Sequence, residues 1–226
     1  YYKLIAANLA LYVFFAKNWR MTIGIIADND QKEALLSRLT GTEFHIEWMD
    51  YPAPLTGAAA IIDFSNSIEK YPASWFESDA TLLFINQVEQ ILLNQPAHFI
   101  RFNGWPGFWQ RPLLEASYRI SGQQAKAEII MALFGKKLEW VTDLPGFLSA
   151  RVLASIINEA YLSLEEGVSS KTDIDTAMKL GTNYPFGPFE WCEKIGANRI
   201  YLLLNEMAVN NQRYLPSSLL KKEAGC

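Results

Sequence analysis

The hydrophobic positions between residues 143 and 167 follow the period of an α-helix. Apolar residues recur there at spacings of three and four, which places them on one face of a helix. That face comprises Val152, Leu153, Ile156, Ile157, Ala160 and Leu164. Pro145 and Gly146 are expected to form a turn before the helix, and Gly167 is expected to end it. This segment therefore predicts a long helix with one buried side.

Two shorter helices are predicted to follow, separated by a tight corner. Ser170 with Asp173 three residues later is typical of a helix N-terminal cap, and Gly181 is expected to end that helix. Residues 185–188 contain two prolines and a glycine, which favour a tight corner, and Gly196 closes the helix after it. This pattern predicts an all-helical domain over residues 143–226.

The first half of the chain alternates short apolar runs with helical patterns. Strands are expected at 22–27, 44–49, 58–64, 80–85, 99–102, 115–120 and 138–141. A helix at 31–39 is expected to turn Leu35, Leu36 and Leu39 inward, and a second helix is expected at 122–134. Strands separated by helices predict a doubly wound parallel sheet over residues 21–142.

The first twenty residues are apolar between Lys3 and Lys17. A bilayer span needs about 20 consecutive apolar residues, so we expect no membrane span here. A secretory signal would have a cluster of positive charges and a small-residue cleavage site, and neither is clear. Two interpretations remain open for this apolar N-terminal extension. It is either a helix that packs on the body or on a partner subunit, or a segment incidental to the fold.

Composition and charge narrow the function. Half of the 226 residues are hydrophobic and 19% are charged, which is typical of a globular protein. The net charge of −4 and the lack of a basic cluster among aromatic residues argue against nucleic acid binding. Two cysteines, Cys192 and Cys226, fit a reducing cytoplasm rather than a disulfide framework. His45 and His98 lack metal-ligand spacing, so we expect no metal site.

An ordered set of residues in the second half matches a known pattern. Its members are Asp143, Pro145, Gly146, Phe147, Arg151, Asn158, Glu159, Ala160, Glu166, Gly167, Val168, Asp173, Asp175, Gly181, Pro185, Gly187, Pro188, Phe189 and Glu190. In this order and register they resemble the C-terminal domain of the 3-hydroxyacyl-CoA dehydrogenase family. The resemblance implies a Rossmann-like domain before it that binds NAD, a helical domain that forms a homodimer, and oxidation of a 3-hydroxyacyl-CoA in fatty-acid metabolism.

The dinucleotide-binding turn departs from the family pattern. In the family, the first strand runs into G-x-G-x-x-G, whose glycines let the pyrophosphate approach backbone N–H groups. Here these three positions hold Ala27, Asn29 and Lys32. Asp28 and Asp30 add carboxylates that would satisfy the N-terminal N–H groups of the helix and repel a phosphate. Two interpretations remain: NAD bound in an altered way, or a helix capped by its own residues.

The resemblance nevertheless suggests residues that would contact NAD. The candidates are Gly24 in the first strand, Asn29 at a former glycine position, and Asp50. Asp50 ends the second strand, where the family places the acid that binds the adenosine ribose. NAD is therefore a possible cofactor by resemblance, and the turn sequence argues against it.

The catalytic positions also depart from the family pattern. In the direct register Ile100 takes the place of the family's catalytic histidine, and His98 lies two residues upstream. Glu115 corresponds to the glutamate that orients this histidine, and Asn86 is kept from the family's S-N-T-S turn. Ala150 replaces an asparagine that holds the histidine and the substrate carbonyl. A carboxylate without its imidazole cannot transfer the same proton at neutral pH unless burial raises its pKa.

Residues 104–111 are richer in aromatics than their family counterpart. Trp105 and Trp109 beside Arg111 could line a pocket for an acyl or aromatic ligand with an anionic head. Alternatively, the aromatic residues fill the vacated active-site cleft. The family's CoA-contacting helical hairpin is reduced here to the short turn at 51–57.

Three functions remain open from the sequence. The chain is a divergent dehydrogenase that uses NAD, a non-catalytic relative that binds an acyl-CoA-like small molecule, or a dimeric scaffold. The loss of the glycines, the histidine and the asparagine favours a pseudoenzyme. The intact helical pattern supports the resemblance to the family.

Overall fold

The computed structural model describes residues 21–37, 39, 44–65, 71, 81–92, 98–118 and 121–226. The predictions for residues 1–20 lie outside these described residues. The chain forms two compact units. The sheet unit holds the residues up to 87 together with 92–104 and 108–140, and the helical unit holds 88–91, 105–107 and 141–226. Two short segments from the first half of the sequence thus belong to the helical unit.

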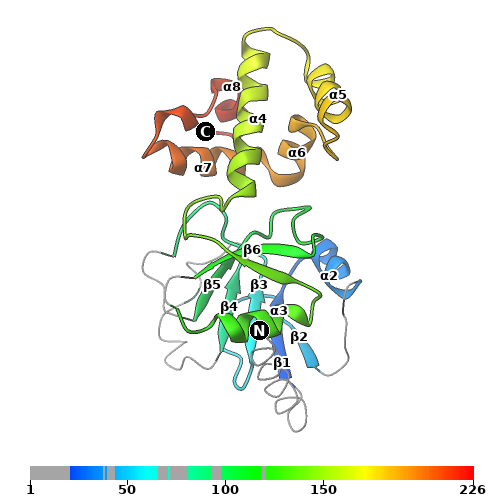
Figure 1. The fold of residues 1–226 in the computed structure, drawn as a ribbon, viewed down its shortest axis with the longest axis vertical. Helices are drawn as coiled ribbons and strands as arrows, with labels where there is room; N and C mark the ends of the chain where they lie inside the picture. The colour runs from blue at the N-terminus through cyan, green and yellow to red at the C-terminus, as the bar shows by residue number, and fades with distance from the viewer. Residues whose placement is uncertain are drawn as a thin grey trace, which may run out of the picture. The chain divides into compact units, whose positions relative to one another are not determined.

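The sheet unit is built on one seven-stranded sheet in the order β2-β1-β3-β4-β5-β6-β7 (Figure 1). Its strands are β1 (Met21–Ile26), β2 (Phe44–Trp48), β3 (Ala60–Asp63), β4 (Leu82–Ile85), β5 (Phe99–Phe102), β6 (Leu113–Tyr118) and β7 (Lys137–Trp140). The predicted doubly wound, Rossmann-like order is confirmed, because β2 and β3 flank β1 on opposite sides.

The expectation of an entirely parallel sheet is wrong at one strand. β6 runs antiparallel to β5, whereas every other pair of neighbouring strands is parallel. Residues 103–112 join β5 to β6 without a helix. A parallel connection requires a crossover of a dozen or more residues, usually a helix, so this short loop returns the chain in the opposite direction.

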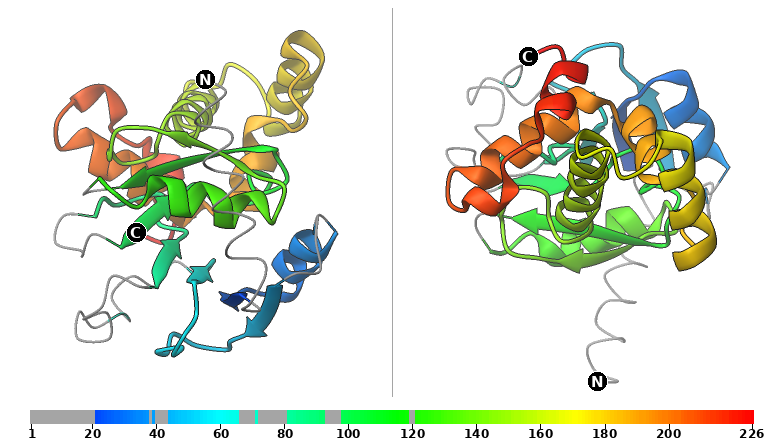
Figure 2. Two further views of the ribbon diagram at one scale, coloured as in Figure 1. Left: turned by 60° about the horizontal axis from the view of Figure 1, so that its bottom comes forward. Right: turned by 90° about the horizontal axis from the view of Figure 1, so that it is seen from above.

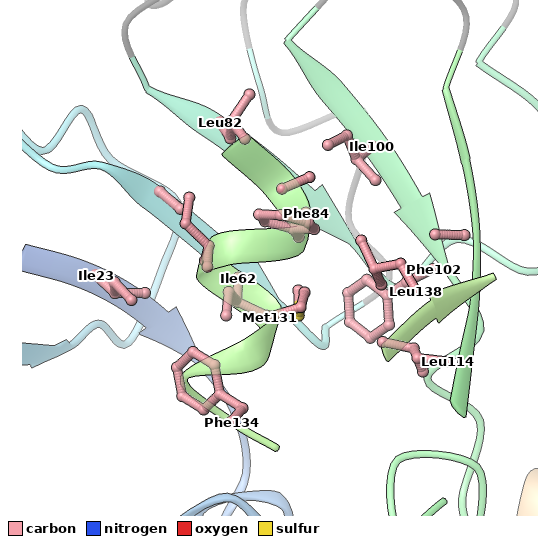
Figure 3. Packing of buried hydrophobic residues seen from close by; sticks show 14 of the residues in the cluster. Ile23, Ile62, Leu82, Phe84, Ile100, Phe102, Leu114, Met131, Phe134 and Leu138 are labelled. Carbon is pink, nitrogen blue, oxygen red and sulfur yellow. The ribbon is translucent and has the colours of Figure 1, made fainter. Parts of the chain in front are cut away.

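The central strands are mostly apolar because both faces of the sheet are buried, with Asp63 in β3 and Arg101 in β5 as buried exceptions. One face carries Ile23, Ile25, Ile62, Leu82, Phe84, Ile100 and Phe102. Helix α3 (Gln124–Ala132) covers this face with Ile130 and Met131, and Phe134 follows the helix into the same cluster (Figure 3). The other face holds a smaller cluster that includes Ile61, Leu83, Ile85 and Phe99.

Helix α2 (Asn29–Leu36) follows β1 directly and buries only part of the predicted face. Leu35 is buried, as predicted, and Leu39 packs against the same core as a partly buried residue. Leu36 is 53% exposed, so its predicted inward orientation is wrong. Successive helical residues point about 100° apart, and the narrow buried face of this helix includes Leu35 but not Leu36.

The helical unit contains only helices and their connections. They are α4 (Ser149–Glu165), α5 (Lys171–Thr182), α6 (Pro188–Ile195), α7 (Ala197–Ala208), the 3₁₀ turn η3 (Gln212–Tyr214) and α8 (Ser218–Glu223). Helix α4 is central, with contacts to α5, α6, α7 and α8, and the right panel of Figure 2 views it nearly end-on. Leu153, Ile157 and Ala160 are buried as predicted, but Val152 is 51% exposed.

The predicted caps of these helices hold with one exception. Ser170 Oγ accepts the N–H of Asp173 at 3.2 Å, and Gly167 and Gly196 follow the helices that they were predicted to end. Gly181 lies inside α5, which continues to Thr182. Asn183 takes the left-handed conformation there, with φ of 56°, and ends the helix in place of the predicted glycine.

Helix α6 receives its N-terminal cap from another helix. Gly187 occupies the cap position and has no side chain to offer. Asp175 of α5 instead accepts the N–H groups of Phe189 at 2.8 Å and Glu190 at 3.2 Å. The carboxylate thereby satisfies two N–H groups that have no partner within their own helix, and it joins α5 to α6.

No described helix is both long and apolar enough to cross a membrane.

Candidate functional site

The point where the strand order reverses, at the carboxyl ends of β1 and β3, is the usual ligand site of such a sheet. Helix α2 begins there, and its N-terminus is closed by its own residues. Asp28 Oδ1 accepts the N–H of Gln31 at 2.8 Å, and Gln31 Oε1 accepts the N–H of Asp28 at 2.9 Å. This reciprocal pair is a capping box. It confirms the interpretation of a self-capped helix.

The residues at this turn do not fit a dinucleotide bound in the family manner. A pyrophosphate would compete with the Asp28 side chain for the N-terminal N–H groups of α2. It would also meet the carboxylate of Asp28 and that of Asp30 in the first turn of the helix. Lys32, at the third glycine position, has its Nζ 5.4 Å from the centre of the Trp48 ring. A charged side chain therefore stands where the family has a glycine.

The three candidate NAD-contacting residues, Gly24, Asn29 and Asp50, differ in burial and in the contacts that they make. Gly24 is buried in β1, and a Cβ there would come within 2.7 Å of Met49 Sδ and 3.0 Å of Leu55 Cδ2. Its missing side chain thus serves packing between the strand and the loop after β2. Asn29 is the exposed first residue of α2, and Asp50 is exposed just after β2. A role of these residues in NAD binding stays a prediction.

Asn86 ties together the carboxyl ends of three strands. Its Nδ2 donates to the carbonyl oxygens of Phe64 and Gly104, both at 3.2 Å, and its Oδ1 accepts the N–H of Gly104 at 3.0 Å. These residues follow β3 and β5, and Asn86 itself follows β4. A Cβ on Gly104 would lie 2.8 Å from the amide of Asn86, so glycine is required for this close approach.

Replacing Asn86 by alanine is expected to lower the free energy of unfolding by about 2–3 kcal/mol. The change removes three hydrogen bonds and leaves buried backbone groups of Phe64 and Gly104 without their partner. Urea unfolding followed by circular dichroism measures the loss. Asn86→Asp keeps the acceptor for Gly104 but turns a buried carboxylate oxygen toward the carbonyl oxygens of Phe64 and Gly104, so it should lose at least as much. A loss in Asn86→Ala below about 0.5 kcal/mol, as at an ordinary surface site, would contradict this role.

Glu115 and Ile100 face opposite sides of the sheet. In the antiparallel pair of β5 and β6, Ile100 stands opposite Tyr118 and packs in the core beneath α3. Glu115 instead accepts a hydrogen bond from Asn103 Nδ2 at 3.0 Å, and Asn103 N–H donates to the Glu115 carbonyl. Because neighbouring positions of a strand alternate between faces, Glu115 cannot orient a base at position 100.

His98 is at the wrong end of β5 to replace the missing base. Its side chain is buried just before the strand, with its ring 5.0 Å from that of Phe99. The carboxyl end of β5 lies four residues further on, about 13 Å along the strand. Ala150, the position of the family asparagine, is fully buried in α4 and offers no amide.

The aromatic stretch is divided between the two units, and a ligand pocket lined by it stays a prediction. Trp105 is fully buried in the helical unit, where its Nε1 donates to Glu89 Oε1 at 3.0 Å. Trp109 is buried in the core of the sheet unit, 4.9 Å from the ring of Phe64. Arg111 is exposed, with its guanidinium 4.1 Å from the centre of the Phe108 ring. Trp105 thus packs in the helical unit and Trp109 in the sheet unit.

A buried acid at the carboxyl end of β3 was missed by the sequence reasoning. Asp63 is fully buried and accepts the N–H of Ser65 at 2.6 Å and the hydroxyl of Tyr71 at 2.8 Å. Burial, and next the charge and hydrogen bond of Asp63, raise the pKa of Tyr71 well above its usual range. The available signal was a lone carboxylate that ends an apolar run.

Among the described residues, no group of three His, Cys, Asp or Glu side chains could hold a metal.

Comparison with known proteins agrees with the helical pattern. Residues 146–224 match the family model of the 3-hydroxyacyl-CoA dehydrogenase C-terminal domain. The 3-hydroxyadipyl-CoA dehydrogenase of Escherichia coli is 47% identical over 92 residues, which are 40% of this chain and 19% of that protein. A probable 3-hydroxybutyryl-CoA dehydrogenase of Bacillus subtilis is 31% identical over 156 residues, 67% of this chain and 54% of that protein.

The chain belongs to the 3-hydroxyacyl-CoA dehydrogenase family.

Solved structures confirm the fold of this dehydrogenase-family chain. The (S)-3-hydroxybutyryl-CoA dehydrogenase of Ralstonia eutropha superposes with a TM-score of 0.67 at 18% identity, over 90% of this chain and 93% of that one. At this identity the likeness concerns the fold alone. The matched regions span about a fifth and about half of the two sequence relatives. The family assignment and the Rossmann-like fold with a helical C-terminal domain, both predicted from the sequence, are confirmed.

Proposed function

We propose that this chain is an oxidoreductase-family protein with degenerate catalysis. It keeps the fold of a 3-hydroxyacyl-CoA dehydrogenase but does not by itself transfer hydride between NAD and a 3-hydroxyacyl-CoA at the family's rate. The observation that carries the proposal is the capping box of Asp28 and Gln31 at the start of α2. One backbone donor at this helix N-terminus, the N–H of Gln31, is engaged here by the protein's own carboxylate.

The arrangement around β5 and β6 supports the same proposal. Proton transfer from the substrate hydroxyl needs a base within hydrogen-bond reach of it. Ile100 is apolar, His98 lies at the amino end of β5, and the carboxylate of Glu115 is held by Asn103. In this chain Glu115 therefore acts as the acceptor of a structural hydrogen bond. We therefore propose that no described residue of β5 or β6 takes over the role of the family's catalytic histidine.

The finer parts of the proposal follow from family membership. The relatives' names refer to 3-hydroxyadipyl-CoA and 3-hydroxybutyryl-CoA, so an acyl-CoA-like molecule is the ligand that we propose for this chain. We also propose that it is a cytoplasmic homodimer that works in fatty-acid metabolism. The intact helical unit, the part of the family that dimerises by resemblance, supports this proposal.

Titration with NADH tests the proposal, because seven tryptophans provide a fluorescence signal. We expect no saturable quenching by NADH and no reduction of acetoacetyl-CoA under conditions in which an active family member is saturated and turns over. Asp28→Gly removes the carboxylate and costs only a few tenths of a kcal/mol of capping, so the variant should fold. It should gain about five- to tenfold in NADH affinity, since one repulsive charge is worth roughly 1 kcal/mol.

A matched variant separates charge from geometry. Asp28→Asn keeps a capping oxygen but loses the charge, so it should gain less affinity for NADH than Asp28→Gly. Equal affinities of the two variants would mean that repulsion alone closes the site. Tight NADH binding with turnover by the unaltered chain would overturn the proposal of degenerate catalysis.

A further inference from the structure

Two arginines converge on one phenol in the helical unit. Arg151 of α4 donates from Nη2 to the Tyr214 hydroxyl oxygen at 3.4 Å, and Arg213 donates from its own Nη2 to the same oxygen. Both guanidiniums also lie near the face of the Tyr214 ring, 5.4 Å from its centre for Arg151 and 4.5 Å for Arg213. Two positive charges are therefore held close together around a neutral side chain.

Neither guanidinium has a carboxylate partner within the part of the chain that the structure describes. Arg151 uses Nη1 for the carbonyl oxygen of Pro145, at 2.9 Å, and Nη2 for Tyr214. Arg213 makes one side-chain hydrogen bond, to Tyr214. An arginine carries five donors, so most donors of this pair have no acceptor among the residues that the structure describes. Like charges this close repel each other unless an anion neutralises them.

The chain around the pair is held in place by several hydrogen bonds and a close packing contact. Asn158 of α4 donates to the Leu215 carbonyl at 2.9 Å and accepts the N–H of Ser217 at 2.8 Å, which fixes the chain on the C-terminal side of Tyr214. On the other side Asn211 Oδ1 accepts the N–H of Arg213 at 3.1 Å. Arg151 packs against Gly146, where a Cβ would come within 2.7 Å of its Cγ. The cost of ordering the site is thus met before any ligand binds.

The charges also act on the phenol itself. Burial raises the pKa of Tyr214, but the hydrogen bonds and charges of Arg213 and Arg151 outweigh burial and hold the pKa below its usual value. The Tyr214 oxygen therefore lies in the positive field of the two guanidiniums, the same field that an added anion would experience. Arg213 is exposed and Arg151 half-buried, so their remaining donors can be reached from solvent.

We propose that Arg151, Arg213 and the Tyr214 hydroxyl form a binding site for a small oxyanion, a carboxylate or a phosphate group. Guanidinium forks match the spacing of carboxylate and phosphate oxygens and bind them with two parallel hydrogen bonds. The site lies wholly within the helical unit and uses none of the residues of the dinucleotide turn. Its existence is therefore independent of whether NAD binds.

Calorimetric titration with inorganic phosphate and with adipate, each against chloride at equal ionic strength, tests this site. We expect saturable binding of at least one of the two oxyanions. Arg213→Gln should weaken it about fivefold or more, because it removes one exposed charge-assisted contact. Arg213→Lys keeps the charge but loses the fork and should weaken it by a smaller factor. Binding of phosphate alone would assign the site to a phosphate group, and binding of adipate alone to a carboxylate.

Lys222→Gln is the matched control, since it removes one exposed positive charge from α8 of the same unit. It should leave oxyanion affinity unchanged. Circular dichroism and the thermal midpoint of each variant establish that it is folded. The proposal is overturned if neither oxyanion binds more tightly than chloride, or if Arg213→Gln and Lys222→Gln weaken binding equally.

Discussion

Replacing Glu89 by alanine is expected to lower the free energy of unfolding by about 3 kcal/mol. Glu89 is buried in the helical unit, and its Oε1 accepts both Arg199 Nε at 2.6 Å and Trp105 Nε1 at 3.0 Å. Removing one partner of a buried ion pair costs about 3–5 kcal/mol, because the other charge is left without compensation. The side chain of Arg199 keeps 24% of its surface exposed, which places the expected loss at the lower end.

Two variants separate the buried pair from an ordinary surface pair. Glu89→Gln keeps an oxygen acceptor for Trp105 and Arg199 and should lose less stability than Glu89→Ala. The pair of Lys171 and Glu223 is 2.7 Å long but exposed on both sides, so Glu223→Ala should cost about 1 kcal/mol or less. Urea unfolding gives all three values. Similar losses in Glu89→Ala and Glu223→Ala would contradict the importance of burial.

This ion pair also shows that the helical unit includes residues that precede the predicted boundary at residue 143. Glu89 and Trp105 precede the predicted boundary by many residues, yet they join Arg199 of α7 in one buried group. The family match over residues 146–224 includes Arg199 and neither of its partners. Sequence patterns locate domains by continuous segments, and contacts made by short connections after strands leave no periodic signal.

Local rules predicted most elements of the fold. The strand at 99–102 was predicted with the bounds that the structure has, because an apolar run between turn residues is a local signal. The antiparallel direction of β6 was not predicted, since an apolar run carries no information on strand direction. The predicted burial of Val152 and Leu36 was wrong for another reason. The helical period was right in both cases, but the width of the buried face depends on neighbours that the period does not reveal.

In the candidate site too, features that depend on residues close in sequence were predicted, and features that depend on residues distant in sequence were not. The cap at Asp28 depends on a residue three positions away, so the sequence was sufficient to expect it. The opposite orientations of Ile100 and Glu115 depend on the register between two strands, which no single segment encodes. Trp105 and Trp109 looked like one pocket because they are close in sequence. Their partners Glu89 and Phe64 are distant in sequence, and these partners decide where each ring lies.

The departures from the family pattern are concentrated in the sheet unit. The turn after β1 carries a capping box in place of the family's glycines, and Glu115 of β6 accepts a hydrogen bond from Asn103. The helical unit keeps its caps, its corner and the matched residues.

Replacing Gly187 by alanine is expected to lower the free energy of unfolding by about 2–4 kcal/mol. A Cβ at position 187 would lie 2.2 Å from Asp175 Oδ1 and 2.4 Å from its Cβ, so the side chain of Asp175 would have to move. Asp175 would then lose its hydrogen bonds to the N–H groups of Phe189 and Glu190. Loss of a helix cap costs about 0.5–2 kcal/mol, and overpacking adds about 1–3 kcal/mol.

Gly181→Ala provides a control in the same helix pair with the opposite expected sign. Gly181 lies inside α5, and a Cβ there would meet no atom within 4 Å. Alanine should therefore stabilise the helical unit by up to about 1 kcal/mol, since glycine is the poorer helix former. Both variants are compared by urea unfolding, with Asp175→Ala to measure loss of the cap alone. Asp175→Ala keeps the Cβ that the new methyl group would strike, whereas Asp175→Gly removes every atom of Asp175 in the clash. Adding Gly187→Ala to Asp175→Gly should therefore cost little more. A full additional loss in the double variant would show that the clash with Asp175 is not what requires glycine at position 187.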